Sequence, residues 1–245
     1  MNSRIFLVGN GPSLAQTDLS KLRNDYSFGM NLIHKIYPYT DWRPSFYMFS
    51  DHPQYIEHAE ELIENHVTRG EYDVFLRNDV AEIVTGEYIP GFGKPANAVE
   101  ELPPWVHTWD RCRRHIALNI LDEDKIPRSF CDRFISERKF CKFGSGMNAM
   151  IQHAVDWGFE TIIFIGTDVD YKVVEDESEG DPNHFIDTYH PAGYWDIERV
   201  SIHDATIRYA HQLFADWASE NGIEVLNASG GNLEAYPRVE YEKLF

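Results

Sequence analysis

The stretch RIFLVGNGPSL at residues 4–14 predicts the fold of this chain. Its apolar run at residues 5–8 is short and is followed at once by Gly-Asn-Gly-Pro-Ser. That order is typical of a buried strand that ends in a tight turn. Gly9 and Gly11 indicate a backbone that turns sharply or comes close to a ligand.

Other short apolar runs continue the pattern. Strands are predicted at residues 4–8, 26–30, 45–50, 74–76, 161–165 and 224–226, with helical periodicity at residues 54–67, 147–157 and 204–221. Strands that alternate with helices predict an α/β, Rossmann-like fold, with a mostly parallel sheet, helices on both faces and a small lid or insert. A strand, loop and helix at the start of a chain often belong to a nucleotide-binding protein.

Two regions do not follow the alternation, and we expect both to lie within one domain over residues 1–245. Residues 80–142 contain five prolines, which predicts an irregular insert. Residues 172–202 are polar and loop-like, and a loop of this length is usually a functional lid or disordered.

Composition narrows the class of protein. The 245 residues carry a net charge of −18, a field that repels nucleic acid and anionic lipid surfaces. Three cysteines, with no Cys-x-x-Cys pair, disfavour a disulfide framework or a zinc site and fit a reducing compartment. We expect a cytoplasmic protein without a signal peptide or a membrane span, because every apolar run is short.

Polar residues follow several predicted strands. Asn31, Asp51 and Asp168 each come just after a strand, as does the Gly9–Gly11 loop. The carboxyl ends of parallel strands face one crevice, so we expect these residues to gather at a ligand site. Singly, each is also ordinary turn chemistry, because Asn and Asp favour turns.

The glycine loop does not match two common nucleotide motifs. Leu14 stands where the dinucleotide fingerprint needs its third glycine, and the P-loop Lys-Ser/Thr is absent, so NAD binding and an ordinary ATPase are disfavoured. Ser145 and Gly146 precede a predicted helix and could open an anion site at its N-terminus, or form a plain helix cap.

Two further patterns could carry chemistry. Asp168 and Asp170 form an Asp-x-Asp pair, a weak candidate for Mg²⁺ or Mn²⁺ binding. His184, His190 and His203 lie in or just after the polar loop, and histidine is the usual general base near neutral pH. Each histidine could equally be an exposed surface residue with no catalytic role.

These residues together resemble the bacterial sialyltransferases of glycosyltransferase family 42. The resemblance is carried by Gly-Asn-Gly-Pro-Ser-Leu after the first strand, Asn31 after the second, Ser145-Gly146 at a helix start and Gly166-x-Asp168. The ending GIEVLNASGGNLEAYPRVEYEKLF, with NHFIDTYHP upstream, is similar to a related group. That group contains glycosyltransferase-like proteins classed with motility accessory factors and hydroxymethylpterin diphosphokinases.

The sialyltransferase resemblance implies one nucleotide-sugar-binding domain, a CMP-activated nonulosonic acid as donor, and no required metal. It implies that donor-binding residues lie among Gly9, Asn10, Gly11, Ser13, Asn31, Asp51, Ser145, Gly146 and Asp168. Asp51 departs from the family, which has an asparagine at that place.

The same resemblance implies the catalytic residues. His203 is nearest to the family's general base, at the start of the helix after the lid, and His190 is the alternative. Tyr171 is close to the place of a tyrosine that assists the leaving phosphate, although Asp170 holds the strict register. We therefore expect a glycosyltransferase that acts on a glycan or other hydroxyl acceptor. A Mg²⁺-dependent pterin diphosphokinase and a non-catalytic nucleotide-binding module are the alternatives.

Overall fold

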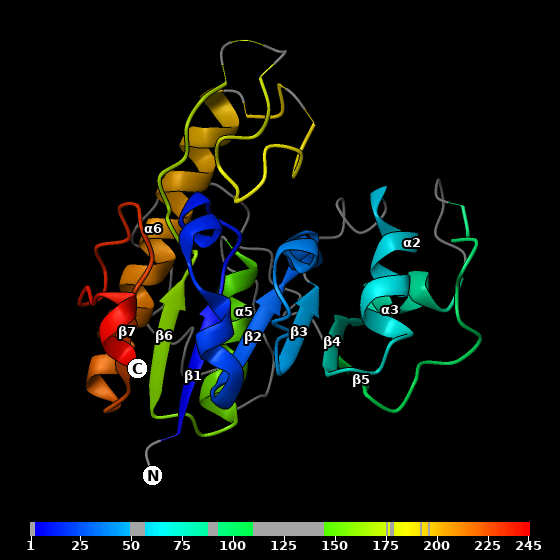
Figure 1. Cartoon of the computed structure of the whole chain (residues 1–245), viewed down its shortest axis with the longest axis horizontal. Coiled ribbons are helices and arrows are strands. Elements are labelled where there is room, and N and C mark those ends of the chain that lie inside the picture. Colours follow the sequence, from blue (N-terminus) through cyan, green and yellow to red (C-terminus); the bar gives the residue numbers. More distant parts are fainter. Residues whose placement is uncertain are drawn as a thin grey trace.

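The computed structural model describes residues 3–49, 57–87, 93–109, 145–174, 176, 179–191, 193–195 and 197–245, with only helical backbone at 198–199 and 201–206. Its centre is a seven-stranded parallel sheet in the order β5-β4-β3-β2-β1-β6-β7 (Figure 1). The strands are β1 (Arg4–Val8), β2 (Tyr26–Met30), β3 (Phe46–Phe49), β4 (Asp73–Arg77), β5 (Val106–Trp109), β6 (Thr161–Ile165) and β7 (Glu224–Asn227). This confirms the α/β, Rossmann-like class.

The central strand shows why the sheet is covered on both faces. Side chains alternate along a strand, and β1 is apolar at every core position. Phe6 and Val8 belong to one buried cluster, whereas Ile5 and Leu7 belong to a second. A parallel sheet with two apolar faces needs helices on each side, and it has them.

The helices divide between these two clusters. The first cluster is covered by the 3₁₀ segments η1 (Pro12–Gln16), η2 (Leu19–Asn24) and η3 (Asn31–Tyr39), by α2 (Ala59–Leu62), by the π-helical η4 (Ile63–Val67) and by α3 (Asn78–Val84). The second is covered by α5 (Gly146–Asp156) and α6 (Ile197–Glu220). The terminal turn η6 (Tyr241–Leu244) packs against the first cluster.

The two irregular regions hold more regular structure than the sequence predicts. Within 80–142, the described part contains most of α3 and the edge strand β5. Within 172–202, the last six residues belong to α6, which begins at Ile197 and not near residue 204. Residue 203 is therefore in the second turn of the helix. Asp51 and all three cysteines lie outside the described residues.

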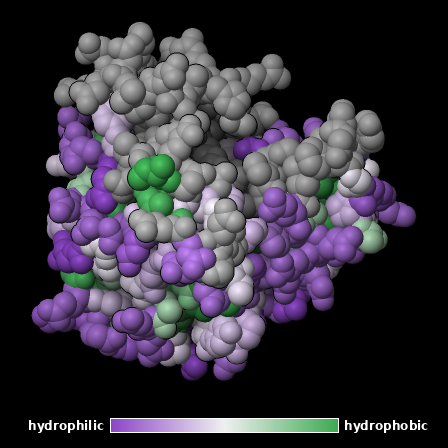
Figure 2. Space-filling model, turned by 90° about the horizontal axis from the view of Figure 1, so that it is seen from above, coloured by the Kyte–Doolittle hydropathy of each residue, from purple (hydrophilic) through white to green (hydrophobic). Residues whose placement is uncertain are grey.

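No described helix is both long enough and apolar enough to cross a bilayer. Seen from above, the described surface is mainly hydrophilic with only small apolar areas (Figure 2). That surface agrees with the strongly acidic composition.

Candidate functional site

The order of the strands places a natural binding crevice between β1 and β6. From β1 the chain adds β2 to β5 on one side, and it then returns to place β6 on the other side of β1. The segments that follow β1 and β6 lead to helices on opposite faces of the sheet. Ligands of open α/β sheets bind at such a switch point, beyond the carboxyl ends of the strands.

The glycine loop is packed tightly against the end of β6. Gly9 N–H donates to Ile165 O at 2.9 Å, and Gly11 N–H donates to Gly166 O at 2.7 Å. A Cβ atom on Gly9 would lie 2.4 Å from Gly166 O, and one on Gly11 would lie 2.4 Å from Asp168 Oδ2. The close approach that the glycines permit is therefore to the neighbouring loop.

Asp168 joins this loop to the C-terminal segment. Its Oδ2 accepts the Ser13 N–H at 2.7 Å, and its backbone oxygen accepts the Asn232 N–H at 2.8 Å. The buried Oδ1 has no hydrogen-bond partner in the described structure. Asp170 is exposed, and its carboxylate accepts from Asn232 Nδ2 at 3.0 Å. The two carboxylates of the Asp-x-Asp pair thus contact different groups.

Two non-glycine residues at the crevice have left-handed backbone. Asn31 has φ of 50° and Val169 has φ of 47°. The conformation is strained for a β-branched residue such as Val169. Arg208 on α6 holds it by donating to Val169 O and to Asn232 O. Strain of this kind clusters at functional sites.

A pocket opens at this edge of the sheet. It is lined by twelve of the residues singled out from the sequence: Gly9, Asn10, Gly11, Asn31, Ser145, Gly146, Gly166, Asp168, Asp170, Tyr171, His184 and His190. Ser13 does not line it and contributes its N–H to Asp168 instead. Asn31 and Asp168 therefore gather with the glycine loop as expected, whereas Asp51 lies outside the described residues.

Helix α5 points its N-terminus into this pocket. Ser145 caps the helix, because its Oγ accepts the Met147 N–H at 3.1 Å. Ser145, Gly146 and Met147 all line the pocket. The Met147 and Asn148 N–H groups already donate to Ser145, so this helix start attracts an anion mainly through the partial positive charge of its first turn.

The lid before α6 closes the pocket opposite the glycine loop. Asn183 connects two segments of the lid. Its Oδ1 accepts the Lys172 N–H at 2.6 Å, and its Nδ2 donates to Lys172 O at 2.8 Å. The Phe185 N–H donates to Asn10 O at 2.9 Å, so the lid is fastened directly to the glycine loop. In Figure 1 the lid lies beyond the tips of the strands.

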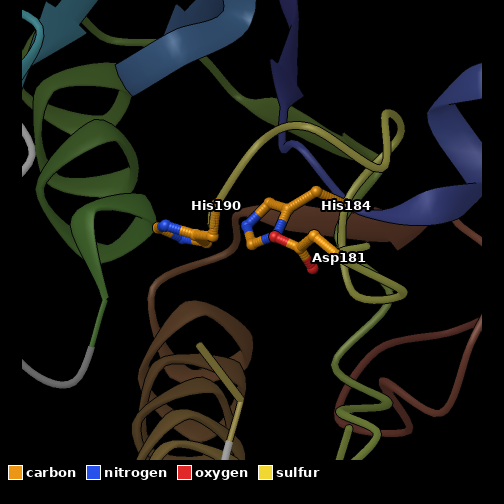
Figure 3. Close-up of side chains that lie close together, drawn as sticks. All are labelled: Asp181, His184 and His190. Atoms are coloured by element: carbon orange, nitrogen blue, oxygen red, sulfur yellow. The ribbon is translucent and has the colours of Figure 1, made fainter. Parts of the chain in front are cut away.

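Imidazole and aromatic rings fill the lid. His184 stacks on Tyr189 with ring centroids 3.8 Å apart, and His190 stacks on Tyr194 at 3.9 Å. His184 Nδ1 is 2.7 Å from Asp181 Oδ2. Figure 3 shows Asp181 and His184 side by side, with His190 next to them. Both histidines line the pocket.

The environment fixes the charge of two of these groups. Burial alone would raise the pKa of Asp181, but the hydrogen bond with His184 and the positive charge that His184 can carry outweigh it, and the pKa is lowered. Burial, with a contribution from His184, lowers the pKa of His190 to about 3. Asp181 is therefore ionised and His190 neutral at pH 7.

A further histidine reaches the pocket from α6. His211 is fully buried, and its Nδ1 is 2.9 Å from the hydroxyl of Tyr236, which itself donates to His211 O. That hydroxyl therefore accepts from Nδ1–H, which leaves a lone pair on Nε2. Burial lowers the pKa of His211 to about 3, so the ring is neutral.

Sequence reasoning missed several pocket residues, namely Asn183, Tyr189, Tyr194, Trp195 and His211, and did not single out Asp181 beside His184. The spacing Asp181-x-x-His184 was the available signal. His203 lies in α6, but its side chain is outside the described atoms. Residue 203 is one helical turn before Ile207 and two before His211, and those two residues line the pocket.

Comparisons of the sequence with protein-family models and with curated proteins find no match. Solved structures do match in fold. A single-residue variant of the sialyltransferase CST-II in complex with CMP gives a TM-score of 0.51 at 14% identity over 97% of this chain and 86% of that chain. CstII from Campylobacter jejuni with cytidine-5'-monophosphate gives 0.49 at 14% identity over 98% and 86%. The monofunctional α-2,3-sialyltransferase Cst-I from Campylobacter jejuni gives 0.43 at 14% identity over 92% and 75%.

Proposed function

We propose that this protein is a glycosyltransferase that transfers a sialic-acid-like nonulosonic acid from a CMP-activated donor to a hydroxyl group of a glycan or other acceptor. The observation that carries the proposal is the pocket at the β1/β6 switch point, into which α5 points its N-terminus. The likeness in fold to a sialyltransferase in complex with CMP supports it.

We place the donor phosphate at the N-terminus of α5, where Ser145 and Gly146 line the pocket. The partial positive charge of a first helical turn stabilises a phosphate, and the Met147 N–H would donate to it in place of Ser145 Oγ. Asn10 and Asn31 would contact the nucleotide or the sugar. Asn10 is suited to this because its buried Oδ1 has no partner among the described residues, while its Nδ2 is held by Met30 O at 3.1 Å.

In the proposed reaction, the acceptor hydroxyl oxygen bonds to the anomeric carbon of the sugar as the bond from that carbon to the phosphate oxygen breaks. The electron pair leaves with CMP. A histidine takes the hydroxyl proton, and Tyr171, which lines the pocket, assists the leaving phosphate. We favour His203 as the base. A ring with the low pKa of His190 has little tendency to take a proton.

In the proposed reaction, the lid excludes water from the pocket. It covers the pocket with the rings of Tyr189, Tyr194 and Trp195, and it is fastened to the glycine loop. Exclusion of water protects a reactive donor from hydrolysis.

A binding and transfer assay tests the proposal. CMP should raise the melting temperature of the wild-type chain more than UDP, GDP or ATP, because a ligand at about 100 times its Kd stabilises a protein by about 2.7 kcal/mol. With CMP-sialic acid and a panel of hydroxyl acceptors, mass spectrometry should detect the transferred sugar.

His203→Ala should lower kcat by roughly 10²–10⁴-fold with little change in CMP affinity. His107→Ala, at an exposed position on β5, is the control and should keep full turnover. Binding of ATP only with Mg²⁺ would favour the pterin diphosphokinase instead, and CMP binding without any transfer would favour a non-catalytic module. Binding of no nucleotide would overturn the proposal.

A further inference from the structure

The lid brings together three side chains of the kind that ligate metals. Asp181, His184 and His190 each offer one potential ligand atom, and these atoms all lie within 4.8 Å of one another (Figure 3). Within the described part of the chain, no other group of three or more such residues is this close together. Asp181 and His190 are buried, and His184 is half-buried.

The cluster is held in place by its surroundings. Asp181 accepts a hydrogen bond at each oxygen, from Asn183 N–H at 2.9 Å and from His184. A carboxylate oxygen has a second lone-pair site, so Asp181 can be held and still ligate. The stacking tyrosines fix the plane of each imidazole.

Binding of one metal ion by all three residues would require only a small movement of their ligand atoms. Bonds of 2.0–2.1 Å in a tetrahedral site place neighbouring ligand atoms about 3.3 Å apart. Asp181 Oδ2 and His184 Nδ1 are 2.7 Å apart across a shared hydrogen, so they would separate by about 0.6 Å and release that proton to solvent as the metal ion binds. The His190 ligand atom lies no more than 4.8 Å from the other two, so it would approach them by at most about 1.5 Å.

The charge of the pocket gives a second reason to expect a bound cation there. Its described lining includes the carboxylates of Asp168 and Asp170 but no lysine or arginine. A helix N-terminus supplies only about half a positive charge. A phosphate-bearing ligand would therefore enter a pocket whose described side chains offer no fixed positive charge.

We propose that Asp181, His184 and His190 bind one divalent transition-metal ion, with its open coordination position facing the pocket. Two imidazoles and one carboxylate suit Zn²⁺ or Fe²⁺ better than Mg²⁺, which prefers oxygen ligands. Three protein ligands and an open position are typical of a metal that meets a substrate oxygen. This site is separate from the Asp168-x-Asp170 pair.

Direct metal binding by the full chain tests the proposal without any assay of activity. After removal of metals with a chelator, the wild-type protein should take up one Zn²⁺ per chain in calorimetry. Co²⁺ should give the visible absorption of a four- or five-coordinate site, and Mg²⁺ should bind far more weakly. Absence of stoichiometric Zn²⁺ and Co²⁺ binding to the folded wild type would overturn the proposal, whatever the outcome with CMP.

Variants locate the site. His184→Ala and His190→Ala should each weaken Zn²⁺ binding by more than about 100-fold, because loss of an outer-shell partner already weakens binding 10–100-fold. The matched control is His107→Ala, which breaks an exposed His–Asp pair with Asp73 and should bind Zn²⁺ as the wild type does. Circular dichroism checks that each variant is folded. Unchanged Zn²⁺ affinity in folded His190→Ala would overturn the proposal.

Discussion

One wall of the pocket is backbone packed on backbone, whereas the opposite wall is a set of rings stacked on one another. In the first wall, Gly9 and Gly11 touch the end of β6 with no room for a side chain. In the second, His184 and His190 lie flat against tyrosines on a loop. The first wall is held by backbone hydrogen bonds, and the second by ring packing and by the hydrogen bonds of Asn183 and Phe185. We call the first wall the cradle and the second the cover.

Gly11→Val should damage the cradle most. Its Cβ would lie 2.4 Å from Asp168 Oδ2 and 2.8 Å from Gly166 O, so the two loops would have to separate. We expect a loss of about 3 kcal/mol or more in the free energy of unfolding by urea, at the upper end for overpacking. The sequence indicated a sharp turn or a close approach to a ligand at Gly11, whereas the structure shows a close approach to the neighbouring loop. Gly93→Ala, which meets open space, is the control.

Acid should destabilise the fold through its buried neutral histidines, among them His153 and His211. Burial lowers the pKa of His153 and of His211 to about 3, against an ordinary value near 6.5. The unfolded chain therefore binds more protons between these values. The stability is full above pH 6.5 and is lost as the pH falls toward 3, by roughly 1.4 kcal/mol per pH unit for each ring.

Urea unfolding at pH 7 and pH 5 measures this effect. His153→Phe should reduce the loss, because phenylalanine keeps the ring among Phe28, Phe75 and Trp157 without titrating. An equal loss in the variant and the wild type would show that His153 does not carry the effect.

Asp168→Ala should have an intermediate effect on the cradle. It removes the acceptor of the Ser13 N–H, and an unpaired buried donor costs about 1–3 kcal/mol. Asp168→Asn keeps an oxygen there and should lose less stability. If Asp168→Asn instead keeps full stability but loses an activity that EDTA also abolishes, Asp168 is a metal ligand and not a structural link.

Asn183→Ala should have the smallest effect on global stability, below about 1 kcal/mol, because it acts on the cover alone. It removes the two hydrogen bonds between the Asn183 side chain and the Lys172 backbone. Amide hydrogen exchange should become faster in residues 179–191 and stay unchanged in the strands. Faster exchange throughout the sheet would contradict the division into cradle and cover.

Prediction from the sequence succeeded where a residue pattern is compatible with a single local structure. The strands β1, β2 and β6 have the predicted bounds, because a short apolar run before a polar turn fits a buried strand and little else. The edge strand β5 was missed. It follows Pro103 and Pro104 and exposes His107 and Thr108, so it lacks the apolar run of a central strand.

The lid could not be predicted in the same way. Its ring stacks depend on how the loop turns back on itself, and no local period encodes that. The early start of α6 was missed because the helix extends beyond the sheet there (Figure 1), and its first residue, Ile197, is exposed and does not belong to a core-facing stripe. Asp181 and His184 are close in the sequence, but their position over the pocket follows from tertiary packing.

The pairing of β1 has a consequence for the order of events during synthesis. β1 emerges first and pairs early with β2, but its other neighbour, β6, begins only at Thr161. At 5–20 residues per second, roughly ten to thirty seconds pass before β6 is made. For that interval one edge of the apolar strand β1 is without its partner strand, a state that favours chaperone binding or premature association. The pocket does not exist until β6 joins, so a ligand of the pocket would not stabilise the growing chain before that point.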